Sequence, residues 1–254
     1  MPWDTPVNDD FMFRIVSGQI PGLSSVNKFG HNPLATTNAA IWSKAGQYSF
    51  FPKTAQIIDV VSSSSADTSG GTGARTIQVV GLDNNWLEVS EFVNLNGSSA
   101  VTLANEYIRM DEAIVVTAGD YETNAGSITL QIQGASTISS YIQVDDGQTK
   151  QAIYTIPANK QAYFVKGYVG VSDDDKNGET AEFQWLMRPN IIDDGAWQVK
   201  GQISLNTIGS SHWQYLYGIP TGPIPPRTDI KIVTIALTAA MGVVGGLDLI
   251  LQDI

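Results

Sequence analysis

The chain has 254 residues and a mass of 27.3 kDa, with 14 Lys and Arg against 25 Asp and Glu, a formal net charge of -11 and no cysteine. A chain of this length fits one large all-β domain or two small ones, and it buries a sizeable core without disulfides. The absence of thiols excludes cysteine nucleophiles and thiolate metal sites. The negative charge disfavours contact with nucleic acid, and none is expected.

The first 44 residues are expected to form an extended N-terminal arm, because Pro2, Pro6, Pro21 and Pro33 interrupt regular structure. The first residues lack the basic and apolar segments of a signal peptide, so we expect synthesis in a cytoplasm. The arm carries apolar side chains that would contact a neighbouring molecule, namely Trp3, Phe11, Phe13 and Ile15.

From residue 45 onward, short runs rich in Val, Ile, Thr and Tyr alternate with clusters of Gly, Asn, Asp and Ser. This pattern is typical of strands and turns, and no alternation with helices accompanies it. The dipeptide Asn96-Gly97 favours a tight turn between two of these strands. The predicted strands are 47–51, 56–63, 75–82, 86–95, 106–117, 127–133, 151–156, 161–172, 180–188, 198–205, 213–217, 229–237 and 243–252.

About a dozen consecutive strands predict an all-β fold, an antiparallel jelly-roll-like β-sandwich over residues 45–254. We expect one continuous domain, with a possible seam between two sandwiches at residues 134–150. The longest uncharged apolar stretch lies between Lys231 and Asp248. It is too short and too rich in Gly for a membrane span, which needs about 20 apolar residues, so no membrane contact is expected.

One loop has part of a calcium-binding pattern. Asp173, Asp175 and Asn177, followed by Gly178, match the first half of a loop in which alternate oxygen atoms surround the ion. The second half does not match, because Gln184 stands where a glutamate would be needed. A weak calcium site and a solvated hairpin tip are the two alternatives, and no cofactor is predicted.

Trp213, Tyr215 and Tyr217 recur at every second position and therefore share one face of a strand. An exposed face would stack on sugars, and a buried face would lie in the core or in a subunit interface. His31 and His212 are the only imidazoles, and adjacent acidic residues on a strand point to opposite faces. No catalytic residue is therefore predicted, and the chain is not expected to be an enzyme.

Five segments of strand-and-turn character are distinctive, and they span most of the chain between residues 26 and 235. They read VNKFGHNP at 26–33, GARTIQVVGLD at 73–83, SEFVNLNG at 90–97, QAIYTIPA at 151–158 and RTDI at 227–230. Together they resemble virion structural proteins of tailed bacteriophages, marine ones in particular. The resemblance implies a component of the virion that is made in the host cytoplasm.

The first hypothesis is a capsid decoration or cement protein that stabilises the particle through protein–protein contacts. Its partners would be the major capsid protein or other virion subunits, and a homo-oligomer, expected to be a trimer, would contact them. The alternative is a tail or fibre component that binds a host surface glycan through the face of Trp213. A carbohydrate-active enzyme is a third hypothesis, for which the sequence supplies only unpaired carboxylates.

Overall fold

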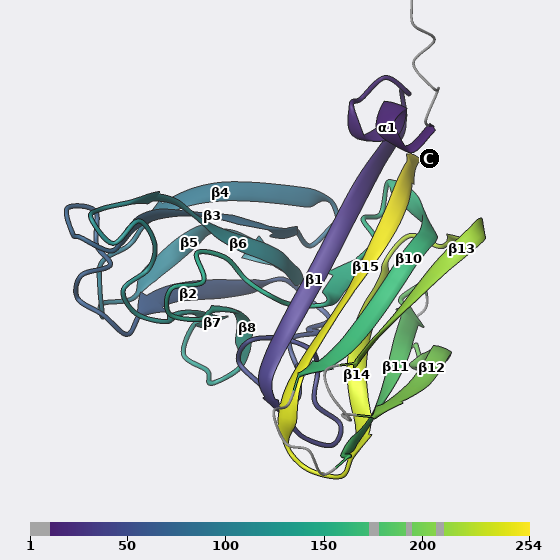
Figure 1. Ribbon diagram of the computed structural model, residues 1–254. Coiled ribbons are helices and arrows are strands. Elements are labelled where there is room, and N and C mark those ends of the chain that lie inside the picture. The colour runs from purple at the N-terminus through teal and green to yellow at the C-terminus, as the bar shows by residue number, and fades with distance from the viewer. Residues whose placement is uncertain (1–10, 173–177, 192–194, 207–210) are drawn as a thin grey trace, which may run out of the picture.

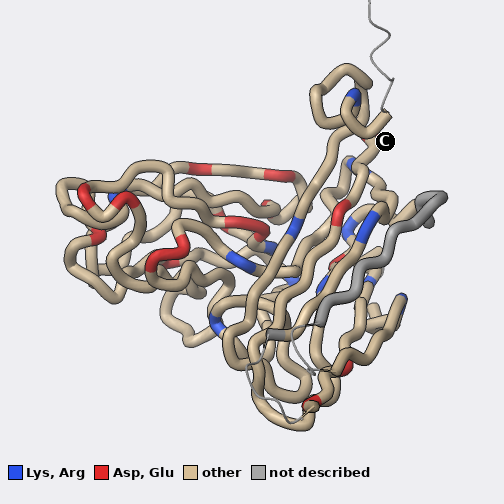
Figure 2. Tube along the Cα trace, in the orientation of Figure 1, with Lys and Arg blue, Asp and Glu red and all other residues tan. Residues whose placement is uncertain are grey.

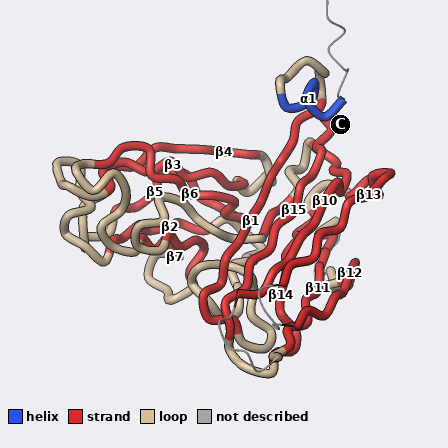
Figure 3. The backbone as a smooth tube through the Cα atoms, viewed as in Figure 1, coloured by secondary structure: helices blue, strands red, loops and turns tan. Residues whose placement is uncertain are grey.

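The computed structural model describes residues 11–172, 178–191, 195–206 and 211–254, with the backbone alone described for residues 172 and 211–221. Strands make up most of this described part, and α1 (Phe11–Val16) is its one α-helix (Figure 3). All strand pairs are antiparallel, and the strands form four small sheets. The predicted all-β class is therefore correct.

Two of the sheets combine the first strand with strands from the second part of the chain (Figure 1). We call this part, together with α1, the helix-bearing half. Its first sheet has the order β1 (Leu23–Ala35), β15 (Met241–Asp253), β10 (Lys160–Ser172) and β13 (Ser211–Ile224). Its second sheet has the order β12 (Gln198–Asn206), β11 (Thr180–Pro189), β14 (Thr228–Leu237) and β9 (Ile153–Thr155).

The other two sheets lie to one side of the helix-bearing half and contain the strands between residues 56 and 142 (Figure 1). One sheet has the order β5 (Val101–Tyr107), β2 (Gln56–Ser62), β7 (Ile128–Ile132) and β8 (Ile138–Ile142). The other has the order β4 (Glu88–Asn94), β3 (Ala74–Leu82) and β6 (Arg109–Ala118).

The prediction of a jelly-roll-like β-sandwich is wrong. The four small sheets stand as four blades in a propeller-like arrangement, and not as the two stacked sheets of one jelly roll. Strand order explains the difference, because β1 pairs with β15 and leaves residues 56–142 to form their own sheets. Local strand patterns predict the strands, but they do not specify which distant strand supplies the partner.

Two hydrophobic clusters fill the spaces between facing sheets. In the helix-bearing half, Phe183, Trp185 and Leu249 belong to a cluster formed by both of its sheets. In the other half, Ile58 and Ile77 belong to a second cluster. Buried and less buried positions alternate along β11 and β2, as expected for strands with one face in the core. A domain boundary within residues 134–150 stays a prediction.

The extended arm predicted for residues 1–44 is wrong for the part that the structure describes. Residues 23–35 form β1, which pairs with β15 from Leu23 opposite Gln252 to Ala35 opposite Met241. Pro33 lies where the register of this pair shifts, a position in which a missing backbone N–H does little harm. Residues 1–10 lie outside the described residues.

Charge is distributed unevenly between the halves. Residues 51–150, which include β2 to β8, contain twelve acidic and four basic residues. Figure 2 shows acidic positions spread over this part of the molecule. We therefore call it the acidic half, and it carries most of the net charge of -11.

Candidate functional site

An open pocket of about 790 Å³ lies between the two sheets of the helix-bearing half. Strands β10, β11, β12 and the end of β13 contribute its walls. The volume falls within the roughly 300–1,000 Å³ that is usual for ligand sites. Most of the wall is apolar and includes Phe164, Trp185, Met187 and Ile224 together with prolines near the strand ends.

Strand β11 directs Trp185 and Met187 toward the space between the sheets, where both are buried. Gly201 of β12 pairs with Trp185, and a Cβ atom at Gly201 would lie 3.4 Å from Cε3 of the indole. A Cβ atom at Gly167 of β10 would lie 2.8 Å from Cζ of Phe164 and 3.0 Å from Nε1 of Trp185. Gly167 therefore lets the two rings come close together, and Gly201 itself places no side chain against the benzene ring of the indole.

The rim of the pocket is polar and carries a positive charge. Lys200 donates a hydrogen bond from Nζ to Oε1 of Gln198 at 2.7 Å, and Gln184 donates one from Nε2 to Oε1 of Gln202 at 2.7 Å. Lys200 is the only charged residue among the described residues that line the pocket. An apolar interior with a basic rim suits an apolar group that carries negative charge beside it.

Helix α1 is the second exposed apolar feature, and it lies at the start of β1 next to the C-terminus (Figure 1). Ile15 is 2% exposed and anchors the helix. Phe11, Phe13 and Val16 are 54%, 60% and 69% exposed. Phe13 and Val16 are three positions apart and share one side of the helix, whereas Phe11 lies on another side.

The structure places only some of the residues that the sequence analysis singled out. Phe11 and Phe13 are exposed on α1, and Ile15 is buried beneath it. The backbone of β13 places Trp213 opposite Val169 of β10, but the side chains of Trp213, Tyr215 and Tyr217 lie outside the described residues. Trp3 and the proposed calcium ligands Asp173, Asp175 and Asn177 also lie outside them.

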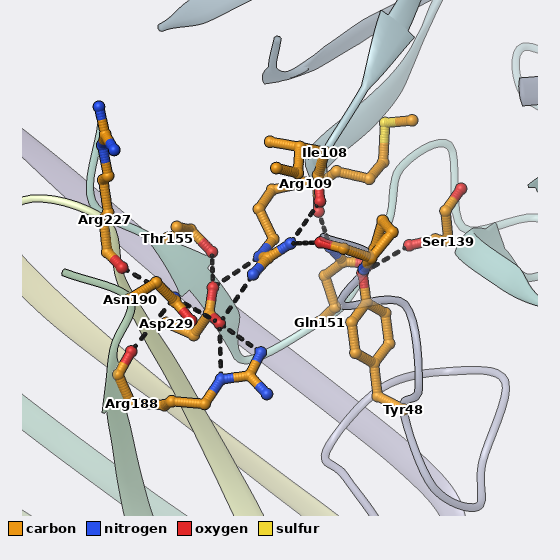
Figure 4. A network of polar contacts seen from close by, with 12 residues as sticks. Tyr48, Ile108, Arg109, Ser139, Gln151, Thr155, Arg188, Asn190, Arg227 and Asp229 are labelled. Carbon is orange, nitrogen blue, oxygen red and sulfur yellow. Dashed lines mark hydrogen bonds and ion pairs between the residues drawn. The ribbon is translucent and has the colours of Figure 1, made fainter. Parts of the chain in front are cut away.

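A buried ion-pair network joins the two halves (Figure 4). Arg109 of β6 donates from Nε to Oδ1 of Asp229 at 2.6 Å and from Nη2 to Oδ2 at 3.0 Å. Arg188 of β11 donates to Oδ2 from Nη2 at 2.6 Å, and Asn190 donates to the same oxygen at 2.9 Å. Thr155 completes the set with a hydrogen bond of 2.8 Å to Oδ1.

Electrostatics keep the central carboxylate ionised. Burial alone would raise the pKa of Asp229, but the guanidinium groups of Arg109 and Arg188 more than offset it, so that the pKa is lowered. Both carboxylate oxygens are already hydrogen-bonded, and Asp229 is fully buried. The network is therefore a joint between the halves and has no free oxygen atom for proton transfer to a substrate.

Aromatic rings enclose the cations of this joint. The guanidinium of Arg109 lies 4.5 Å from the ring centre of Trp86, and that of Arg188 lies 4.6 Å from the ring centre of Trp197. Nζ of Lys231 lies 4.2 Å from the same Trp197 ring. Burial, with a contribution from the nearby Arg188, lowers the pKa of Lys231 to about 8. Cation–π contacts of this type stabilise desolvated cations.

This joint was not predicted from the sequence. Residues 227–230 contributed only to the resemblance, although Asp229 is an acidic residue beside a run of apolar strand residues. Such an acid at a position expected to be buried signals a paired cation. The sequence does not indicate that Arg109, which is 120 residues away, supplies it.

Comparisons with known proteins do not indicate a family or a fold for this chain. No family model matches the chain, and no curated protein matches it. Among solved structures, a mutant VP2 protein of infectious bursal disease virus in derived T=1 particles is 11% identical, with 96% of this chain and 79% of that chain covered and a TM-score of 0.22. The VP2 subviral particle of the same virus is 10% identical, with 91% and 72% covered and a TM-score of 0.18. TM-scores this low do not show a common fold.

Within the described residues, no group of three or more His, Asp or Glu side chains is arranged to hold a metal ion. No described helix has the length and apolar character needed to cross a bilayer.

Proposed function

We propose that the chain is a virion structural protein of a tailed bacteriophage, a capsid decoration or cement protein that stabilises the particle through protein–protein contacts. The observation that carries this proposal is the exposure of Phe11, Phe13 and Val16 on a helix that the buried Ile15 holds in place. Exposed apolar side chains raise the free energy of the chain in water, and a partner that covers them lowers it.

The charge distribution supports an orientation on the particle. The helix and the open pocket both belong to the helix-bearing half, and the acidic residues are concentrated in the other half (Figures 1 and 2). The helix-bearing half would contact the major capsid protein or other virion subunits. The acidic half would then project into solvent, away from the packaged DNA, whose phosphates repel it.

The proposal is tested with capsids of the phage that encodes the chain, prepared without this protein. The purified wild-type chain should sediment together with these capsids and raise the temperature at which they break. Binding that is undetectable at every protein concentration, with capsids intact, would overturn the proposal. Bovine serum albumin, an unrelated acidic protein, serves as the control for trapping in the pellet.

A glycan array decides between this function and the tail or fibre alternative. We expect no glycan to bind above background. Strong binding of one class of glycan, together with no binding to capsids, would refute the decoration role and support host recognition instead.

A further inference from the structure

The joint between the halves carries an excess of positive charge, although the whole chain has a net charge of -11. Arg109, Arg188 and Lys231 surround the single carboxylate of Asp229. Among the described residues, Asp229 is the only acidic side chain that forms an ion pair with any of these three cations. Two of the three positive charges are therefore left without a counter-charge.

Strand pairing explains why Lys231 lies beside Arg188. Lys231 and Asp229 are two positions apart on β14 and therefore share one face of the sheet. Arg188 of β11 pairs directly with Asp229, which makes it a diagonal neighbour of Lys231. Such neighbours lie about 7–8 Å apart, within reach of long side chains. Both cations also lie against the ring of Trp197.

Both cations have hydrogen-bond donors to spare. Lys231 forms no ion pair and donates no hydrogen bond to any described residue, and its Nζ lies against the rings of Trp197 and Phe51. Arg188 directs Nε and Nη2 toward Asp229, whereas its Nη1 donates to no described acceptor (Figure 4). The side chain of Arg188 is 18% exposed and Lys231 is half-buried, so a small ion can reach them from the solvent.

The electrostatics favour an anion at this place. Burial, together with repulsion from Arg188, lowers the pKa of Lys231 to about 8, and attraction by Asp229 offsets only part of the decrease. Asp229 has no oxygen to spare for Lys231, because both already accept hydrogen bonds from other residues. An added anion beside Lys231 would stabilise its ammonium form and offset the repulsion between the two cations.

We propose that the joint binds a tetrahedral oxyanion with two negative charges, phosphate or sulfate. Nζ of Lys231 and Nη1 of Arg188 donate charge-assisted hydrogen bonds to it, which are the stronger class in proteins. Its two charges balance the two unpaired positive charges. The negative net charge of the chain disfavours anions elsewhere, so we expect one ion per chain.

Equilibrium dialysis with radiolabelled sulfate tests the site directly, because sulfate keeps both of its charges throughout the neutral pH range. In a phosphate-free buffer of constant ionic strength, the wild-type chain should bind one sulfate in a saturable manner. Unlabelled phosphate should displace it, and acetate, which has one charge, should compete at least tenfold more weakly. Absence of saturable binding by the wild type would overturn the proposal.

Two variants locate the bound ion. Lys231→Met removes the ammonium group but keeps an unbranched side chain against Trp197, and it should weaken sulfate binding by about tenfold or more. Lys44→Met is the matched control, because Nζ of Lys44 also lies against a ring, 5.1 Å from the centre of Tyr141. The control should bind like the wild type. Equal binding by the wild type and Lys231→Met would overturn the proposal.

The dependence on pH separates the charge of Lys231 from its packing. The affinity of the wild type for sulfate should fall as the pH rises from about 7 to about 9, because Lys231 loses its charge in this range. The other charged groups of the joint, Arg109, Arg188 and Asp229, keep their charges there. Lys231→Arg should therefore bind with constant affinity. A wild-type affinity that does not change with pH would overturn the proposal.

Thermal unfolding provides a readout that a purely structural lysine would not give. Sulfate stabilises proteins in general, so the comparison is between variants. Its gain in melting temperature over sodium chloride of equal ionic strength should be larger for the wild type than for Lys231→Met. In chloride, Lys231→Met should be at least as stable as the wild type, because it removes a partly desolvated cation without a counter-charge. Equal gains would overturn the proposal.

The last comparison concerns the chain's own carboxylates. Asp193 and Asp194 are close in sequence to Arg188 and Trp197 but lie outside the described residues. The double variant D193N/D194N should bind sulfate at least as tightly as the wild type. Binding by this variant, with none by the wild type, would assign the site to the chain's own carboxylates and overturn the proposal.

Discussion

Lys28 donates a hydrogen bond from Nζ to the backbone carbonyl oxygen of Asp111 at 2.5 Å, and this contact joins β1 of the helix-bearing half to β6 of the acidic half. Both side chains are buried, and within the described part of the chain no hydrogen bond reaches Oδ2 of Asp111. Burial lowers the pKa of Lys28 and raises the pKa of Asp111 to about 7. The junction between the halves therefore contains a carboxyl group that titrates near neutral pH.

Asp111→Asn is expected to flatten the dependence of stability on pH between about pH 4 and pH 7. The pKa of Asp111 is higher in the folded chain than in the unfolded chain, so the folded chain binds more protons in this window. The free energy of unfolding therefore falls as the pH rises from about 4 to about 7, by up to about 4 kcal/mol in total. Urea denaturation at several pH values measures this slope.

The matched control for this titration is Asp120→Asn, because Asp120 is exposed. It should keep the slope of the wild type. Equal slopes for the wild type and Asp111→Asn would show that Asp111 does not titrate in this window.

Asp229→Asn is expected to lower the free energy of unfolding by about 3–5 kcal/mol, because it leaves the buried guanidinium of Arg109 and that of Arg188 without a counter-charge. Asp253→Asn is the control, since the pair of Asp253 with Lys160 is more exposed and removing it should cost at most about 1 kcal/mol. Chemical denaturation of both variants checks the difference. A loss of less than 1 kcal/mol at Asp229 would contradict the role of the joint.

The sign of the pH dependence at Asp229 is opposite to that at Asp111. The pKa of Asp229 is lower in the folded chain than in the unfolded chain. Its contribution to the free energy of unfolding is therefore fully present above the ordinary carboxyl pKa of 3.8. This contribution is lost as the pH falls through the folded pKa. Acid titration of the wild type and of Asp229→Asn should show a steeper loss in the wild type.

Asp67→Ala is expected to release the loop between β2 and β3. The buried carboxylate of Asp67 accepts a hydrogen bond from Ser62 Oγ at 2.6 Å and from the backbone N–H groups of Ala74, Ala125 and Gly126 at 2.7, 2.8 and 2.9 Å. Each buried N–H group left without an acceptor costs about 1–3 kcal/mol.

Hydrogen exchange should report this release as faster exchange at residues 62–74 and 124–126 in Asp67→Ala. Asp67→Asn is an intermediate variant, because its amide retains one acceptor oxygen and places N–H donors at the other position. It should therefore lose less protection than the alanine variant. Unchanged exchange in Asp67→Ala would refute the role of Asp67 in holding the loop.

Gly30→Ala is expected to destabilise the chain by about 1–3 kcal/mol, through overpacking. A Cβ atom at Gly30 would lie 2.3 Å from the carbonyl oxygen of Ile41 and 2.5 Å from the backbone nitrogen of Ala152, which are hydrogen-bonded to each other at 2.9 Å. Gly70→Ala is the control, because a Cβ atom there has no neighbour within 4 Å. Its melting temperature should stay close to that of the wild type, and equal melting temperatures for both variants would contradict this explanation.

Local patterns predicted most of the strands. The alternation in residues 75–82 and 127–133 corresponds to β3 (Ala74–Leu82) and β7 (Ile128–Ile132). Asn96-Gly97 lies between β4 and β5, and Gly97 has a positive φ of 60°, but the two strands belong to different sheets, so the predicted tight turn does not join a hairpin. Residues 231–248 also divide into two strands, β14 and β15, as predicted. These features depend on neighbouring residues, which the sequence displays directly.

Other strands escaped prediction because their partners are remote. Strand β1 contains Gly30 and Pro33, which argue locally against a strand, but β15 pairs with it more than 200 residues later. Residues 47–51 were predicted as a strand and form none, since the structure gives them no partner strand. Their aromatic side chains pack into the core instead, with Tyr48 5.1 Å from Trp42 between ring centres.

The sequence by itself determined the all-β class, the alternation of buried and exposed strand positions and the absence of thiol chemistry. Only the tertiary structure decided the four separate sheets, the pocket beside Trp185 and the pairing of Arg109 and Arg188 with Asp229. Side-chain polarity and backbone conformation are local properties of each residue. Strand partners, cavities and buried ion pairs arise where distant segments meet, and their free energy depends on the whole set of contacts.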